Sequence, residues 1–354
     1  MKIFKIVKNN KLYTVLFLFV LLINILVFTD WIMEKFSPSK KPEVTLTQCE
    51  ASSHKDDIKA SQDKLSVVAK QNPLLYFFLA MFNFTLLFML LIGLILDLYF
   101  LRQWIKKKKI DICILSQKES VWGISDVVRV ILINMSFGYT FLIIQGTLSK
   151  VFPVVGNENF RMIFNTMIMN VIGISVVLYF VIKKGKQNIE AVGLTSQSFT
   201  KSVFYAVIGY ISLGPLLVLI MTGTFFVIDF FHYKPQVQSI VQIFVKENNL
   251  PVLFFSTLFA GVFGPIVEEI FFRGFMYSAI KKSIGVLGAM IITSVVFSLL
   301  HAHVIGFLPI MTLGLLLAYL YEKTGSLTAS ITVHIMHNVA MLVLVFLVRC
   351  IGAQ

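Results

Sequence analysis

Long uninterrupted runs of apolar residues alternate with short polar segments along most of the 354-residue chain. The runs are about 20 residues long, which is the length that an α-helix needs to cross a bilayer. They lack the two-residue alternation of a membrane β-barrel strand, so the pattern predicts helices. We therefore expect an all-α, polytopic transmembrane helix bundle of about eight to nine spans, because helices satisfy their own backbone groups in lipid.

The apolar runs also divide the chain. Residues 34–72 form the longest hydrophilic segment and are expected to be an extracytoplasmic loop. We expect an N-terminal transmembrane region, residues 1–190, with about four spans, and a second helix bundle over residues 191–349. The individual spans are expected near residues 12–30, 73–101, 128–149, 162–182, 202–231, 251–281, 286–303, 306–322 and 327–349.

Basic clusters between the runs indicate how the chain is oriented. "RQWIKKKKID" at 102–111 and "KKGKQ" at 183–187 are separated by two expected spans, so both lie on one side. Because short cytoplasmic loops are enriched in Lys and Arg, we expect a cell-membrane protein with a cytoplasmic N-terminus. The net charge of +13 is explained by the same loops and by contact with anionic lipid headgroups. We expect no nucleic-acid partner.

Two other compositional features narrow the class of protein. Only 14% of residues are charged, whereas soluble domains average about 25%. The three cysteines, Cys49, Cys113 and Cys350, form no CxxC pair, so no thiolate metal site is indicated.

The segment "PIVEEIFFRGF", residues 265–275, places three ionisable side chains inside an apolar run. Such residues face a cavity or a partner, since charge is costly in the bilayer. Glu269 and Arg273 are spaced i, i+4 and are expected to pair. Glu268 points about 100° away around the helix and has no local partner. A carboxyl group without a partner in an apolar environment has a raised pKa, which suits a general base.

Four of the six histidines lie beyond residue 300, close to the C-terminal end of the chain. His301 follows Glu268 in the sequence, and a turn expected near residue 282 is about equidistant from both. In an antiparallel hairpin the two side chains would come to similar depth. His303 lies at the expected helix end and is secondary.

The last expected helix carries a polar stripe. His334 and Asn338 in "TVHIMHN" are spaced i, i+4, and His337 lies roughly on the same side. A purely structural alternative is an interhelical hydrogen-bond network, worth about 1 kcal/mol per contact in membranes. For Glu268 the corresponding alternative is a protonated carboxyl group that bridges helices.

Two chemistries fit these side chains. In the first, Glu268 and a histidine activate a water molecule, and Asn338 with a histidine stabilises the oxyanion. In the second, His301, His334 and Glu268 hold a zinc ion whose water attacks the substrate. The chain contains no HExxH motif, the common signature of zinc proteases. The residues alone leave both mechanisms open.

Three motifs resemble those of the CPBP family, the type II CAAX-processing endopeptidases and bacteriocin-processing proteins. They are EExxxR in "EEIFFR", FxxxH in "FSLLH" and HxxxN in "HIMHN", and they follow in this order between Glu268 and Asn338. The resemblance covers about residues 190–345, including "IEAVGL" near its start. It implies an all-helical membrane protease whose site opens to an aqueous cavity.

The resemblance also implies roles for individual residues. Glu268 would activate the water, Glu269 and Arg273 would support it, and the remaining motif residues, His301, His334 and Asn338, would bind the water or the oxyanion. It does not decide whether a metal such as zinc takes part. The region before residue 191 goes beyond a minimal family core and leaves the choice of substrate open. A composition rich in Lys, Phe and Ile is typical of AT-rich bacterial genomes.

The leading hypothesis is therefore an intramembrane endopeptidase acting on a peptide or protein in or at the membrane. One alternative is a catalytically silent regulator or bacteriocin-immunity-type protein that binds a membrane partner, such as a sensor protein. A second is transport, because buried Glu, Arg and His also mark ion pathways. It ranks lower, since these groups gather at one place and do not form a chain across the bilayer.

Overall fold

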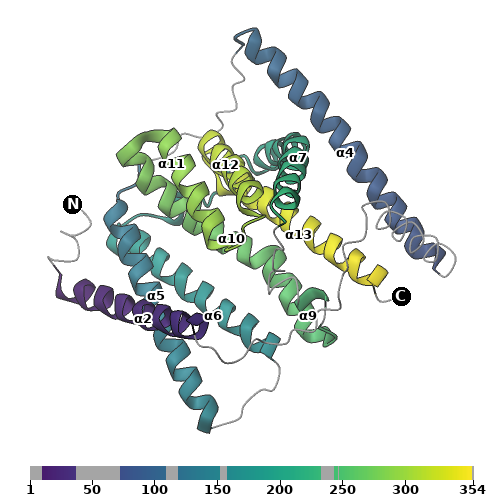
Figure 1. Ribbon diagram of the computed structural model, residues 1–354. Helices are drawn as coiled ribbons and strands as arrows, with labels where there is room; N and C mark the ends of the chain where they lie inside the picture. Colours follow the sequence, from purple (N-terminus) through teal and green to yellow (C-terminus); the bar gives the residue numbers. More distant parts are fainter. Residues whose placement is uncertain are drawn as a thin grey trace.

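The computed structural model describes residues 10–36, 72–108, 119–151, 158–232, 243–245 and 247–352, and within these ranges it contains helices and no strands. The α-helices are α2 (Lys11–Phe36), α4 (Pro73–Ile105), α5 (Ile124–Val151), α6 (Glu158–Leu178), α7 (Phe199–Phe230), α9 (Leu250–Leu258), α10 (Gly264–Glu269), α11 (Ser278–Leu300), α12 (Phe307–Thr324) and α13 (Leu327–Gly352) (Figure 1). The π-helical segments η1 (Tyr179–Lys184), η3 (Phe259–Phe263) and η4 (Ile270–Tyr277) continue or join these helices, and η2 (Ile189–Val192) is a short 3₁₀-helix.

The expected all-α, polytopic bundle is confirmed. Seven helices in the described part of the chain are long and apolar enough to cross a membrane. One of them is unusually long, because α9, η3, α10, η4 and α11 follow one another without interruption from Leu250 to Leu300. Residues 37–71, which hold most of the expected extracytoplasmic loop, lie outside the described residues, as do Cys49 and Cys113.

A single glycine folds this long helix back on itself. Gly285 has φ 80° and ψ 178°, a backbone conformation that is essentially restricted to glycine. The limb after Gly285 returns along the first limb, since the rings of Phe297 and Phe272 meet edge to face with centroids 5.2 Å apart. The antiparallel hairpin expected from the sequence is therefore present, with its turn at Gly285, slightly later than the expected position near 282.

The main hydrophobic core joins the two halves of the chain. Trp122, just before α5, stacks on Phe275 of η4 with ring centroids 5.4 Å apart. Its indole Nε1–H also donates to the Phe275 carbonyl oxygen at 2.9 Å. Val130 of α5 and Val177 of α6 belong to the same buried cluster. The division into regions 1–190 and 191–349 stays a prediction, and α5 and α6 share their core with the second region.

The helices α2 and α4 lie at the periphery. Figure 1 shows α2 alongside α5 and α4 alongside α7, at different edges of the molecule. The α4–α7 contact is close at Gly93, because an added Cβ there would lie 2.4 Å from the carbonyl oxygen of Ile211. Near this point the hydroxyl group of Ser212 donates to the carboxylate of Asp97.

Lysines from several helix ends meet at one end of the bundle. Lys184, at the end of η1, donates to Asp126 at the start of α5. Lys282, near the Gly285 turn, donates to the Ser120 carbonyl oxygen at 3.3 Å. Of these residues, Lys184 belongs to the 183–187 segment expected to be cytoplasmic, and the cytoplasmic placement of the N-terminus stays a prediction.

Candidate active site

A fully buried ion pair lies at the centre of the candidate site. The guanidinium Nη1 of Arg273 donates to Oε1 of Glu269, and both side chains are 0% exposed. This confirms the i, i+4 pair expected from the sequence. The second terminal nitrogen of Arg273, Nη2, donates to the Gly314 carbonyl oxygen at 3.2 Å. Because a buried charge is costly unless it is paired and hydrogen-bonded, these contacts are what allow Arg273 to stay inside the bundle.

The surroundings of Arg273 depend on close helix packing. A Cβ atom at Gly314 would lie 3.1 Å from Cβ of Ser294, so glycine lets α12 approach the returning limb of α11. The carbonyl group of residue 314 is thereby brought within reach of Arg273. The guanidinium carbon also lies 4.6 Å from the centre of the Phe297 ring, a cation–π distance.

His334 of α13 connects the ion pair to Glu268. Its Nδ1 lies 2.9 Å from Oε1 of Glu269, the same oxygen that accepts from Arg273. A carboxylate that accepts from Arg273 can only accept again, so Nδ1 of His334 carries the proton and donates. In a neutral ring Nε2 then has a free lone pair, and it lies 3.8 Å from Oε2 of Glu268.

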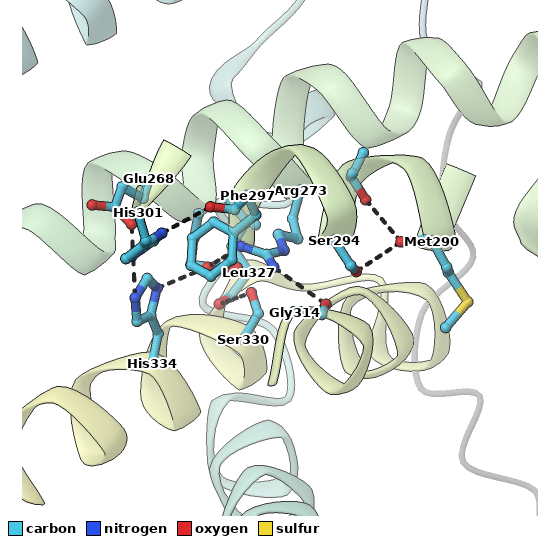
Figure 2. A network of polar contacts seen from close by, with 12 residues as sticks. Glu268, Arg273, Met290, Ser294, Phe297, His301, Gly314, Leu327, Ser330 and His334 are labelled. Carbon is cyan, nitrogen blue, oxygen red and sulfur yellow. Dashed lines mark hydrogen bonds and ion pairs between the residues drawn. The ribbon is translucent and has the colours of Figure 1, made fainter. Parts of the chain in front are cut away.

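His301 presents its ring in the same protonation form. It ends the returning limb of α11, and its Nδ1 lies 2.8 Å from the Phe297 carbonyl oxygen. A carbonyl oxygen accepts only, so Nδ1–H donates and the Nε2 lone pair stays free when the ring is neutral. The Phe297 ring touches both imidazoles, with centroid distances of 4.7 Å to His301 and 5.5 Å to His334. Figure 2 shows Glu268, His301 and His334 side by side.

Glu268 differs from its neighbour in sequence. Its side chain is 35% exposed, whereas that of Glu269 is 0% exposed. Three buried polar atoms at the site have no hydrogen-bond partner among the described residues: Oε2 of Glu268, Oε2 of Glu269 and Nε of Arg273. Glu268 thus combines a partly exposed side chain with a buried carboxylate oxygen that has no hydrogen-bond partner among the described residues.

Asn338 lies one helical turn beyond His334 and is held by a backbone irregularity. Its Nδ2 donates to the Ala260 carbonyl oxygen at 2.8 Å. Ala260 belongs to η3, where Gly264 N–H donates five positions back, to the Phe259 carbonyl oxygen. The residue five positions after Ala260 is Pro265, which has no N–H group and cannot donate to the Ala260 carbonyl oxygen. The side chain of Asn338 therefore supplies the donor that the helix lacks at this carbonyl.

The described residues contain no preformed cluster of side chains that could bind a zinc ion. In residues 10–36, 72–108, 119–151, 158–232, 243–245 and 247–352, no group of three His, Cys, Asp or Glu side chains is placed to hold one metal ion. His301, His334 and Glu268 would have to move closer together to share an ion. The involvement of zinc stays a prediction.

Comparisons with known proteins match the part of the chain that holds these residues. A family model described as "Type II CAAX prenyl endopeptidase Rce1-like" matches residues 250–340. Residues 250–340 are thus similar to this family, and we call them the Rce1-like segment. A Bacillus subtilis (strain 168) protein named "Putative membrane peptidase YdiL" is 31% identical over 85 residues, which is 24% of this chain and 35% of that protein. The chain thus spans about a third of the length of that curated relative. No solved structure matches the chain.

The Rce1-like segment contains all seven fixed residues of the three motifs: Glu268, Glu269, Arg273, Phe297, His301, His334 and Asn338. The resemblance to the CPBP family is confirmed over this segment, which begins at residue 250 and so after the expected start near 190. "IEAVGL" lies outside it but supports it structurally. Gly193 accepts a hydrogen bond from Leu327 N–H at 2.8 Å, and a Cβ at Gly274 would lie 2.9 Å from Val192.

Several contacts of the site were not expected from the sequence. Arg273 uses the backbone of Gly314 and Asn338 uses the backbone of Ala260, and a carbonyl group leaves no residue-specific signal. His303, which we expected to be secondary, accepts a hydrogen bond from Gly306 N–H at 3.0 Å and thereby shapes the turn before α12. Pro265 was the sequence signal that the Ala260 carbonyl group would lack a helical donor, because proline has no N–H group.

Proposed function

We propose that the chain is an intramembrane endopeptidase that hydrolyses a peptide bond in a membrane-associated peptide or protein. The observation that carries this proposal is the position of Glu268, partly exposed and 3.8 Å from the free Nε2 of His334, beside a fully buried Glu269–Arg273 pair. The family description and the name of the Bacillus subtilis relative support a protease at the membrane.

In the proposed reaction Glu268 accepts a proton from a water molecule held near the Nε2 lone pairs of His301 and His334. The resulting hydroxide attacks the peptide carbonyl carbon, and the negative charge moves to the carbonyl oxygen. Asn338 uses only one of its two amide N–H groups on Ala260, so the other is available to this oxyanion. When the carbon–nitrogen bond breaks, Glu268 returns its proton to the departing amine.

The two adjacent glutamates receive different roles from their contacts. Oε1 of Glu269 already accepts from Arg273 and from His334, so this carboxylate is committed to holding other groups. Glu268 has an unpartnered oxygen and no cationic neighbour at hydrogen-bond distance in the described residues. We therefore assign proton transfer to Glu268 and positioning to Glu269.

The test compares peptide termini in membranes of cells that produce the wild-type chain, Glu268→Gln, or Glu190→Gln as a control. Glu190 is an exposed residue of η2. We expect new peptide termini in cells that produce the wild type or Glu190→Gln, and no such termini with Glu268→Gln. The cleavage rate of Glu268→Gln should be about 10²- to 10⁴-fold lower than that of the wild type. Identical termini in all three samples would reject the endopeptidase proposal and favour the regulator alternative.

Metal removal separates the two mechanisms. We expect the purified protein in detergent to cleave an internally quenched peptide with an apolar segment at an unchanged rate after treatment with a chelator. The reason is that Glu268, His301 and His334 activate the water in the proposed reaction without a metal ion. A loss of cleavage that zinc restores, and magnesium does not, would contradict this and favour the zinc alternative.

A further inference from the structure

A second polar pair lies next to the candidate site and has no role in the reaction above. Tyr210 of α7 and His337 of α13 approach each other with the hydroxyl oxygen 3.3 Å from Nδ1 of the imidazole. Their rings meet edge to face, with centroids 6.0 Å apart and an interplanar angle of 85°. Both side chains are partly buried. Neither residue belongs to the three motifs, although His337 directly precedes Asn338.

The contact with Tyr210 is compatible with a form of His337 whose proton sits on Nε2. Nδ1 of His337 is the one hydrogen-bond partner of the Tyr210 hydroxyl group among the described residues. A tyrosine hydroxyl group can either donate to Nδ1 or accept from it; when it donates, the remaining proton of the neutral ring sits on Nε2. This is the opposite form from His301 and His334, whose Nδ1–H groups donate and whose Nε2 atoms are acceptors.

The candidate site has many acceptors and few donors. Glu268 and the Nε2 atoms of His301 and His334 suit a water molecule that donates its protons. An oxyanion needs N–H or O–H donors, and typical oxyanion sites use more than one. The proposed reaction supplies one donor, the second N–H of Asn338. His337 directly precedes Asn338 and is spaced i, i+3 from His334 on α13, so these residues lie on roughly the same side of that helix.

We propose that Nε2–H of His337 is a second donor to the oxyanion, and that Tyr210 is a positioning residue that keeps His337 in this form. The inference rests on the proposed endopeptidase function and adds a group that its three motifs do not include. It also gives α7 a part in catalysis, because Tyr210 is the residue of that helix that reaches the imidazole.

The test uses purified full-length protein in detergent and an internally quenched peptide with an apolar segment. We expect His337→Leu to lower kcat by about 10²- to 10³-fold with little change in KM, as for loss of an oxyanion donor. His337→Gln keeps an N–H donor and should retain a rate within about tenfold of the wild type. Tyr210→Phe should lower kcat by about tenfold, since the ring can then adopt either form.

Tyr205→Phe is the matched control. It removes a hydroxyl group from the same helix, in the same α7–α12 packing cluster, without a side-chain hydrogen bond in the described structure. We expect wild-type kcat for this variant. In the His337→Gln background, Tyr210→Phe should have no further effect, because an amide has no tautomer to fix; such non-additivity is typical of residues that act through each other.

Wild-type kcat in His337→Leu would overturn the inference, and so would an undiminished effect of Tyr210→Phe in the His337→Gln background. A decrease in kcat that is proportional to the loss of thermal stability in every variant would also overturn it. If His337→Leu does not fold, the comparison of kcat between His337→Gln and the double variant His337→Gln/Tyr210→Phe still tests the inference. Cleavage that Glu268→Gln leaves intact would instead reject the endopeptidase function itself. Cleavage that needs Glu268 but neither Tyr210 nor His337 rejects this inference alone.

Discussion

At the scale of single residues, Arg273 shows how a charge is kept in an apolar bundle. Its side chain is 0% exposed, and it contacts a carboxylate, a backbone carbonyl oxygen and the face of an aromatic ring. Glu269 in turn holds His334, whose free nitrogen faces Glu268. Arg273 thus helps to orient His334, the neighbour of Glu268, through Glu269 and without a hydrogen bond to Glu268 itself.

This arrangement predicts different costs for removing two arginines. Arg273→Met should destabilise the protein by about 3–5 kcal/mol, because Glu269 would remain buried without its counter-charge. Arg129→Met should cost about 1 kcal/mol or less, since its side chain is 25% exposed and pairs with Asp126 near the helix end. Unfolding in mixed detergent micelles measures both, and equal losses would contradict the assignment.

At the scale of secondary structure, irregular helices surround Glu268 and Glu269. The short helix α10, which ends with Glu268 and Glu269, lies between the π-helical segments η3 and η4. π-Helical turns are rare and are frequent at functional sites. Here the irregularity has an identifiable local consequence, since it leaves the Ala260 carbonyl group to Asn338.

A pair of substitutions tests this account of Asn338. Asn338→Ala should lower the free energy of unfolding by about 1–3 kcal/mol, because the partly buried carbonyl group of Ala260 loses its donor. Pro265→Ala adds an N–H group five positions after Ala260, so in the Asn338→Ala background it should restore part of the loss. Thermal unfolding of the single and double variants measures the effect. If the double variant is no more stable than Asn338→Ala, the missing N–H group at Pro265 is unrelated to the role of Asn338.

At the scale of the whole molecule, the candidate site is supported by helices outside the Rce1-like segment. Trp122 packs on the ring and backbone of Phe275, and α5 and α6 contribute buried residues to the core that contains η4. The peripheral helices α2 and α4 contact α5 and α7 and contribute no residue to the candidate site. The supporting core therefore begins near residue 119, within the region expected to be separate.

This packing predicts that a fragment starting at residue 191 will not fold, because it would expose the core surface around Phe275. Trp122→Ala in the full chain should already cost about 3–5 kcal/mol, the range for removing a buried Trp side chain. Size-exclusion chromatography in detergent and thermal unfolding measure the two effects. A monodisperse, cleavage-competent fragment 191–354 would contradict the shared core.

The sequence predicted the helices well because bilayer spans leave a strong signal of continuous apolar runs. It also predicted the Glu269–Arg273 pair from helical spacing and the similar depth of Glu268 and His301 from one hairpin. It placed the turn near Lys281 and Lys282, but these residues stay helical and bond to Glu322 and Ser120. The backbone partners of Arg273 and Asn338 depend on tertiary packing and leave no pattern in one sequence.

The turn at Gly285 limits how the length of this region can change. Glu268 and His301 lie on opposite limbs, at nearly equal distances along the chain from this glycine. Inserting one residue between either group and the turn would rotate that group by about 100° and shift it by about 1.5 Å relative to its counterpart. Insertions and deletions in residues 269–300 should therefore be tolerated only as compensating changes in both limbs, whereas the chain before Leu250 is free of this constraint.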